Sequence, residues 1–472
     1  MNPENKIIGK KIYSDFDQKI FSTISGDCNP IHLNKLVSRK LISGEPIVHG
    51  INLFLTALNF FLNYQHKIPS SFKITFKKPV LLNKVTYFLL NEYEKKIFVT
   101  GSNQEVLVSI KYDKLLSNYN EKNSKFFYSL DKLEKPFRNN FNKLSLNSVY
   151  KVLYGGDSKF IDTYYPFLKS KIGVYTVYEI SLLSNIVGMQ LPGLQSLFVG
   201  CDIDIRNQDN KTKPIFKIID LDRRFKKIKS LYSGVNINSN IFAYQTPKNT
   251  NVSSCHNLKK TIEPNSVLKN KHAIIIGGSR GIGAYVAKIL SLYGCDVTIT
   301  YAFGKYEANK VINDINLNTN SNAYSIKFDV TTDNYTSINY KSFDHLYYFA
   351  TPKIVSKSTK VFDKNRFKIF YNFYCNYFKK IALLFFKEKG NKLIYYPSTI
   401  LINNFDSSFE EYIKAKKEGE LSCKELIRKN KNIIIDRLAK VKTDQTLNIF
   451  GESGISPAKT ALLIVNKVVE SM

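Results

Sequence analysis

The chain has 472 residues, which is too long for a single hydrophobic core and predicts two to four domains. Hydrophobic residues make up 43% and charged residues 23%, so long disorder is not expected outside short linkers. The net charge of +30 comes from lysines scattered along the sequence, without a basic block or a nucleic-acid motif. Nucleic-acid binding is therefore not expected.

Six cysteines lie far apart and form no CxxC pair, which predicts neither a zinc site nor a disulfide framework. The N-terminal residues MNPENKIIGKKIYSDF contain no apolar core of a secretory signal. The longest uncharged stretch, Ser181 to Cys201, contains several amides and a proline and is interpreted as a buried helix followed by a strand. We therefore predict a cytoplasmic protein with no metal site and no membrane partner.

The first 125 residues or so combine one apolar helix pattern, Ile51 to Tyr64, with strand patterns at Ser71 to Leu82 and Val106 to Tyr112. Residues from about 140 to 246 repeat this order. A helix pattern, Ile180 to Met189, precedes further strand patterns: Gln195 to Ile205, Phe216 to Asp220 and Ile228 to Tyr244.

An offset of 130 residues aligns the two copies. It carries Gly26-Asp27 to Gly156-Asp157, His32 to Asp162, and Gly50 at the first helix start to Ile180 at the second. We therefore expect the second copy to keep the fold and to lack the histidine.

The segment 251–268 is polar and predicts a linker. From Lys271 onward strands alternate with helices, which indicates a parallel α/β sheet. The predicted organisation is a unit over 1–125, a second and degenerate unit over 126–250, the linker, and an α/β domain over 269–472.

The first candidate site contains Asp27 and His32, which flank the turn-forming dipeptide Asn29-Pro30. An acid and an imidazole in this arrangement could hold one water, or move one proton onto and one off a substrate. A helix that begins near Gly50 would direct free backbone N–H groups at a developing oxyanion. Addition of water to an enoyl thioester, or its removal, needs these three elements. In isolation, Asp27 could instead cap the turn and His32 could pack in the core.

The surrounding residues, FSTISGDCNPIH with Ser38 and PIVHG, resemble the MaoC-like, (R)-specific enoyl hydratases of the hot-dog fold over about the first 110 residues. The resemblance implies that Asp27 and His32 are the catalytic pair and that the Gly50 amide is an oxyanion donor. His49 is interpreted as structural. The second copy then resembles the degenerate unit of a double hot-dog hydratase, an α+β arrangement.

The second candidate site begins where the apolar strand pattern Lys271 to Ile276 leads into a glycine-rich turn and an apolar helix. Such a turn lets a pyrophosphate approach a helix N-terminus closely. The predicted cofactor-binding residues of the turn are Gly277, Ser279, Arg280, Gly281, Ile282 and Gly283.

Further along the chain, Ser398 follows a predicted strand, Leu393 to Tyr396, and precedes Tyr412 and Lys416. Positions four apart share one helix face, so the Lys416 ammonium could lower the high pKa of the Tyr412 phenol. Ser398 could then hold the substrate oxygen.

Residues 269–472 resemble a short-chain dehydrogenase/reductase with a Rossmann fold. The resemblance implies that Tyr412 is the proton donor, Lys416 its partner and ribose contact, and Ser398 the third catalytic residue. It also implies an adenine contact for Asp329 and a proton-relay role for Asn372, with Asn376 as a competing match. The chain departs from the family at Ile276, where threonine is usual, and at 348–351, where Tyr-Phe-Ala-Thr replaces Asn-Asn-Ala-Gly.

No acid follows the predicted strand Asp296 to Tyr301, whereas Arg280 and Lys305 could meet a 2′-phosphate, so NADP is favoured over NAD. Together the sites predict a 3-oxoacyl-thioester reductase joined to an (R)-3-hydroxyacyl-thioester dehydratase, acting on acyl-CoA or acyl carrier protein thioesters in fatty acyl or polyketide-like synthesis. Two alternatives are a reductase with a non-catalytic acyl-binding half and a non-catalytic acyl-binding assembly subunit. Both resembled families suggest a homo-oligomer.

Overall fold

The computed structural model describes residues 5–41, 43–116, 119, 121, 131, 133–153, 156–205, 214–247, 251–356, 361–446 and 454–472. The chain divides into two compact units, one formed by the described residues up to 247 and one by those from 251 onward. Each unit has its own buried hydrophobic core.

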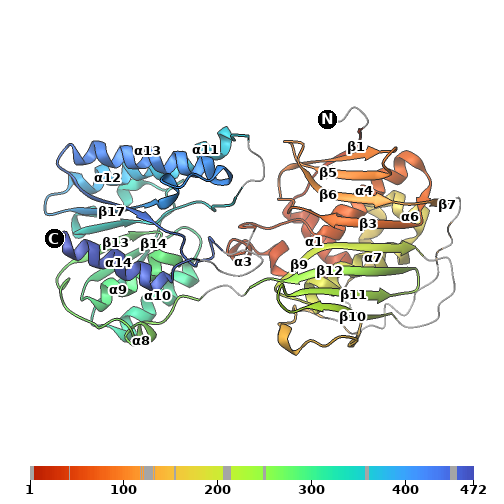
Figure 1. Ribbon diagram of the computed structural model, residues 1–472, viewed down its shortest axis with the longest axis horizontal. Helices are drawn as coiled ribbons and strands as arrows, with labels where there is room; N and C mark the ends of the chain where they lie inside the picture. Colours follow the sequence, from red (N-terminus) through yellow and green to blue (C-terminus); the bar gives the residue numbers. More distant parts are fainter. Residues whose placement is uncertain are drawn as a thin grey trace. The chain divides into compact units, whose positions relative to one another are not determined.

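The N-terminal unit contains a ten-stranded antiparallel sheet, with the long helices α4 and α7 behind it in the view of Figure 1. In sheet order the strands are β1 (Lys6–Ile12), β4 (Val85–Asn91), β5 (Lys96–Thr100), β6 (Val106–Tyr112), β3 (Ser71–Phe76), β9 (Ser196–Ile205), β12 (Ile237–Gln245), β11 (Lys227–Ser233), β10 (Ile215–Asp222) and β8 (Val149–Lys151). The helices are α1 (Asp15–Ser25), α2 (Pro30–Leu33), α3 (Lys35–Ser38), α4 (Gly50–Gln65), α5 (Ile161–Tyr164), α6 (Pro166–Ile172) and α7 (Val174–Asn185), which continues as a π-helical turn (Ile186–Gln190). Strands β2 (Ile68–Pro69) and β7 (Leu115–Leu116) form a separate pair.

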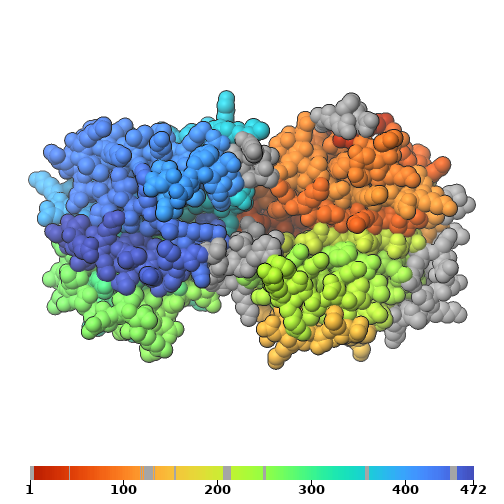
Figure 2. Space-filling model, in the orientation of Figure 1, coloured from red at the N-terminus to blue at the C-terminus, as the bar shows by residue number. Residues whose placement is uncertain are grey.

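The ten-stranded sheet is built from two halves with the same strand order. From the outer edge inward, β1-β4-β5-β6-β3 corresponds to β8-β10-β11-β12-β9, and β3 pairs with β9 at the junction. At that junction a Cβ on Gly200 would lie 2.4 Å from the carbonyl oxygen of Ile74, so the two strands can approach only with glycine there. Figure 2 shows the first half (orange) packed directly against the second (yellow-green). The repeat predicted from the sequence is therefore present in the strand order.

The predicted offset of 130 residues holds for part of the repeat only. Strand β4 begins at Val85 and β10 at Ile215, 130 residues later. Helix α4 begins at Gly50 as predicted, whereas α7 begins at Val174, so the prediction that it begins at Ile180 is wrong. The offset changes because the connections between corresponding elements differ in length.

Helices α4 and α7 are buried on nearly all sides, which explains why their apolar residues do not follow one stripe. Among the described residues, no single helix is both long enough and apolar enough to cross a membrane. One pair of helices, Pro166–Ile172 and Val174–Gln190, meets these criteria only when taken together, and it is bent by 116°.

The C-terminal unit contains a six-stranded parallel sheet covered by helices on both faces, the α/β architecture that the sequence predicts (Figure 1). In sheet order the strands are β15 (Ala323–Lys327), β14 (Asp296–Tyr301), β13 (His272–Ile276), β16 (His345–Tyr348), β17 (Leu393–Thr399) and β18 (Asn432–Leu438), a Rossmann order. The helices are α8 (Cys255–Leu258), α9 (Gly281–Leu292), α10 (Lys305–Asn318), α11 (Lys364–Tyr371), α12 (Phe378–Lys387), α13 (Glu410–Ile427) and α14 (Pro457–Glu470), with a π-helical turn (Asn372–Tyr377) between α11 and α12.

The segment predicted as a linker, 251–268, belongs to the C-terminal unit. It contains α8 and buries Cys255, Leu258 and Leu268 in the core formed with α9. The Ser254 side chain caps α8 by accepting a hydrogen bond from the Asn257 amide. The linker prediction failed because a few apolar side chains in a polar segment are enough to anchor it.

Candidate active sites

The loop after α1 places Asp27 and His32. Helix α1 ends at Gly26, which adopts the left-handed conformation with φ of 66°. The Asn29 side chain accepts a hydrogen bond from the Ile31 amide (3.1 Å), and Pro30 occupies the first position of α2. The chain therefore turns sharply between the acid and the imidazole, as the sequence predicts.

The Asp27 carboxylate is only 1% exposed and is held by two donors. The Ser184 hydroxyl donates to Oδ2 (2.7 Å), and the Asn29 amide donates to Oδ1 (3.1 Å). Burial raises the pKa of Asp27, while the nearby His32 and the Ser184 hydrogen bond act in the opposite direction.

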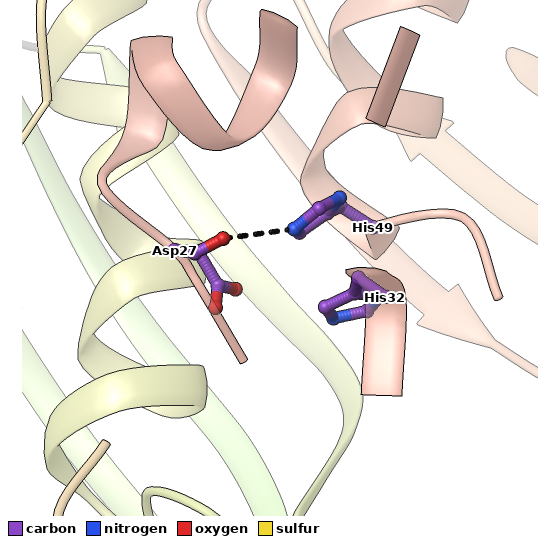
Figure 3. A group of neighbouring side chains, drawn as sticks. All are labelled: Asp27, His32 and His49. Atoms are coloured by element: carbon purple, nitrogen blue, oxygen red, sulfur yellow. Dashed lines mark hydrogen bonds between the residues drawn. The ribbon is translucent and has the colours of Figure 1, made fainter. Parts of the chain in front are cut away.

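Two stacked imidazoles lie opposite this carboxylate (Figure 3). The rings of His32 and His49 are 3.7 Å apart and inclined by 24°. Nδ1 of His32 hydrogen-bonds the Ile47 carbonyl (2.8 Å), and Nε2 of His49 hydrogen-bonds the Asp27 carbonyl (3.2 Å). Burial lowers the pKa of both imidazoles, so their neutral forms are favoured.

Possible ligand atoms of Asp27, His32 and His49 all lie within 4.8 Å of one another, which would permit a metal ion by distance alone. The ring stacking argues against one. Lone pairs of stacked imidazoles run nearly parallel in their ring planes and do not converge on one point. The same arrangement suits a pair that exchanges protons with a substrate.

Gly50 begins α4, and the preceding His49 side chain makes no capping hydrogen bond to the first turn of this helix. The first backbone amides of α4 are therefore not capped by that side chain, as an oxyanion-binding role requires. A Cβ on Gly50 would lie 2.8 Å from the Phe76 ring, so a side chain there would displace the helix start.

The second half of the sheet supplies contacts that the sequence did not reveal. Besides Ser184, a Cβ on Gly188 would lie 2.5 Å from Oδ1 of Asp27, so only glycine leaves room for the carboxylate. The Asn29 amide donates to the carbonyl of Gly188 (2.7 Å), and the Asn185 amide donates to that of Gly26 (2.9 Å). The half without the histidine therefore fixes the acid supplied by the other.

In the C-terminal unit, the candidate cofactor residues lie at the carboxyl edge of the parallel sheet, where such folds bind ligands. Gly277 and Gly281 have φ of +85° and +56°, and a Cβ on Gly283 would lie 2.5 Å from the Gly277 carbonyl oxygen. Helix α9 begins at Gly281 with no side-chain cap. The turn therefore fits an anionic group such as a pyrophosphate.

The other predicted cofactor contacts are placed less uniformly. Arg280 forms an ion pair with Asp444, and Lys353 donates to the Asp444 carbonyl (2.6 Å). Asp329 follows β15 and accepts hydrogen bonds from the amide and hydroxyl of Thr331. Ser279 is buried at the start of the turn, and Ile282 packs against the core.

The predicted catalytic serine makes its hydrogen bond inside the protein. Ser398 lies within β17, and its hydroxyl donates to Oε1 of Glu420 on α13 (2.6 Å). Arg437 on β18 binds both oxygens of the same carboxylate, from Nε (2.8 Å) and Nη2 (2.6 Å). The neighbouring Thr399, in contrast, hydrogen-bonds the Tyr412 side chain.

Tyr412 and Lys416 lie on the same face of α13, as predicted, but the lysine does not act on the phenol as expected. The Lys416 ammonium donates to the Pro397 carbonyl (2.6 Å) and lies 3.9 Å from the Tyr374 ring centre. Burial lowers its pKa to about 7. Burial also raises the pKa of Tyr412 to about 12, opposed by the Thr399 hydrogen bond and not by the lysine.

The two asparagines predicted as alternatives for a proton relay both lie in the π-helical turn after α11. Nδ2 of Asn376 donates to Oδ1 of Asn372 (2.8 Å). Both line a surface depression together with Lys379 and Lys380. The contacts described for this part of the chain do not bring Asn372 to Tyr412.

Comparison with known families separates the two units. Residues 11–112 match the family model described as MaoC like domain, and residues 271–344 match the model described as short chain dehydrogenase. No curated protein sequence matches this chain.

Several solved structures are similar to part of the chain. A short chain dehydrogenase from Burkholderia cenocepacia, in complex with NADP, is 21% identical, covers 43% of this chain and 91% of its own, and has a TM-score of 0.38. The angucycline C-6 ketoreductase LanV with bound NADP is 16% identical over 43% of this chain and 90% of its own, with a TM-score of 0.37. An alcohol dehydrogenase from the archaeon Thermococcus sibiricus, complexed with 5-hydroxy-NADP, is 14% identical over 42% and 90%, also with a TM-score of 0.37.

Proposed function

Because the chain joins a MaoC-like domain to a short-chain dehydrogenase domain, we propose that it acts twice on one acyl thioester. The C-terminal unit reduces a 3-oxoacyl thioester with NADPH, and the N-terminal unit dehydrates the resulting (R)-3-hydroxyacyl thioester. The N-terminal unit is proposed to be a double hot-dog whose second half is degenerate. The observation that carries the proposal is the buried Asp27 carboxyl facing His32, with the uncapped start of α4 at Gly50.

The electrostatics of the first site suit dehydration. Burial favours a protonated Asp27 and a neutral His32, which are the acid and base that elimination of water requires. His32 removes the proton from C2, and Asp27 protonates the leaving 3-hydroxyl group, so one water is lost. The Gly50 amide donates to the thioester oxygen while it carries negative charge. The reverse sequence hydrates an enoyl thioester.

At the second site, NADPH supplies the hydride that reduces C3 of the 3-oxo group. Tyr412 donates a proton to the carbonyl oxygen, and the turn between Gly277 and Gly283 holds the pyrophosphate. Arg280 and Lys305 would meet the 2′-phosphate, which requires Arg280 to leave Asp444. The NADPH preference in turn supports the biosynthetic direction, toward a fatty acyl or polyketide-like chain.

Two assays on the full chain test the proposal. Hydration of crotonyl-CoA, followed at the enoyl thioester absorbance, is expected to disappear in an Asp27→Asn variant that still oxidises NADPH with acetoacetyl-CoA. A Tyr412→Phe variant is expected to show the opposite pattern. If neither CoA nor carrier-bound enoyl substrates are hydrated, the dehydratase assignment is wrong. Reduction with NADH alone would remove the support for the biosynthetic direction.

A further inference from the structure

The hydroxyl of Ser398 is committed to an ionised carboxylate. Glu420 receives two hydrogen bonds from Arg437 and one from Ser398, and the Arg437 hydrogen bond keeps the pKa of Glu420 below its ordinary value. A hydroxyl has one proton to donate, and an ionised acceptor holds it more strongly than a neutral carbonyl would. Ser398 could donate to a substrate carbonyl only by abandoning Glu420.

The strand pairing shows why this arrangement is stable. Ser398 on β17 is directly paired with Arg437 on β18, and Glu420 approaches both from α13. Only 4% of Ser398 is exposed. These three residues therefore tie α13 to two strands of the sheet, which is a structural task.

Thr399 has the free proton that Ser398 lacks. Its oxygen accepts a hydrogen bond from the Leu401 amide (3.3 Å), which uses one lone pair and leaves the O–H group available. The hydrogen bond between its side chain and Tyr412 places this hydroxyl beside the phenol. A carbonyl oxygen that accepts a proton from Tyr412 would therefore lie within reach of Thr399.

We infer that Thr399, and not Ser398, is the hydroxyl that binds the substrate carbonyl oxygen beside Tyr412. This inference rests on the proposed reductase function. During reduction, hydride from NADPH forms the new bond at C3, the Tyr412 proton moves to the carbonyl oxygen, and the Thr399 O–H group donates to that oxygen while its charge develops. NADP⁺ and the 3-hydroxy thioester are the products.

The test compares three variants of the full chain in NADPH oxidation with acetoacetyl-CoA. Thr399→Val removes the hydroxyl at nearly constant shape and is expected to lower kcat by about 100-fold, the loss typical of one oxyanion donor. Thr399→Ser keeps a hydroxyl and should restore kcat to within about tenfold of the wild type. Ser398→Ala, the matched neighbour, should lose much less activity than Thr399→Val. Crotonyl-CoA hydration by each variant and thermal melting report on folding.

The opposite ranking, with Ser398→Ala inactive and Thr399→Val active at equal thermal stability, would overturn the assignment and leave the reductase function standing. A wild-type chain without reductase activity would refute the proposed function. In that case calorimetric titration of the NADP⁺ complex with acetoacetyl-CoA decides the inference. Weaker binding in Thr399→Val alone supports Thr399, whereas equal binding in both variants, or none in the wild type, refutes it.

Discussion

Replacement of Ser184 by alanine should move the pH profile of the first site. The Ser184 hydroxyl donates to the buried Asp27 carboxylate at 2.7 Å. A hydrogen bond to a charged group contributes about 1.5–3 kcal/mol, and 1.36 kcal/mol corresponds to about one pKa unit. Loss of this donor should therefore raise the pKa of Asp27 by about one to two units beyond the increase that burial already causes.

Because Asp27 and His32 titrate as a coupled pair, the change need not appear in one limb of the profile. The active pair holds one proton, so its profile is bell-shaped. The sum of the two apparent pKa values depends on the total cost of removing both protons and should rise by the full amount. The centre of the bell should accordingly move up by about half to one pH unit, while His49 stays neutral.

The measurement is kcat/KM for crotonyl-CoA hydration across pH in the wild type, Ser184→Ala and Ser181→Ala. Ser181 is the matched control because it is buried in the same helix but donates to the Tyr178 carbonyl and not to Asp27. An unchanged profile in Ser184→Ala, or an equal shift in Ser181→Ala, would refute the view that the second half tunes the acid.

Three further predictions concern single positions. Gly188→Ala would put a Cβ 2.5 Å from the Asp27 carboxylate, so we expect hydration to fall about 100-fold while NADPH-dependent reduction is unchanged; equal activity would show that the loop yields. Gly283→Ala would put a Cβ 2.5 Å from the Gly277 carbonyl and should weaken NADPH binding in a fluorescence titration without affecting hydration; tight binding would contradict the assigned role of the turn. Burial raises the pKa of Glu179 to about 7, above its unfolded value, so its contribution to stability is present below about pH 4.5 and is lost as pH rises through 7. Denaturant unfolding should show a loss of up to about 3 kcal/mol over that range, which Glu179→Gln should reduce; an identical pH dependence in the variant would reject this origin.

Much of the first site could be predicted from local sequence. Residues 26–32 form a turn whose conformation is set by a glycine, an asparagine cap and a proline, all within seven positions. The apolar run that begins after Gly50 likewise specifies a buried helix. Ser184 and Gly188 could not be predicted, because their contacts with Asp27 join residues far apart in the chain whose own sequence shows only an apolar helix.

The second site shows a different limit. The sequence places Tyr412 and Lys416 on one helix face, and the structure agrees. It does not specify the direction of the ammonium, which depends on the Pro397 carbonyl and on the Tyr374 ring. The adjacent hydroxyls of Ser398 and Thr399 are equivalent candidates by spacing, and only the packing of β17, β18 and α13 distinguishes them.

The sequence by itself therefore determined the elements whose causes are local: the two catalytic turns, the two apolar helices, the duplicated strand order and the parallel α/β unit. Hydrophobic periodicity, caps and glycines act over a few residues and can be interpreted without coordinates. The tertiary structure alone decided which side chain completes each site and with what pKa. Those properties depend on burial and on hydrogen bonds between distant segments, which no local pattern encodes.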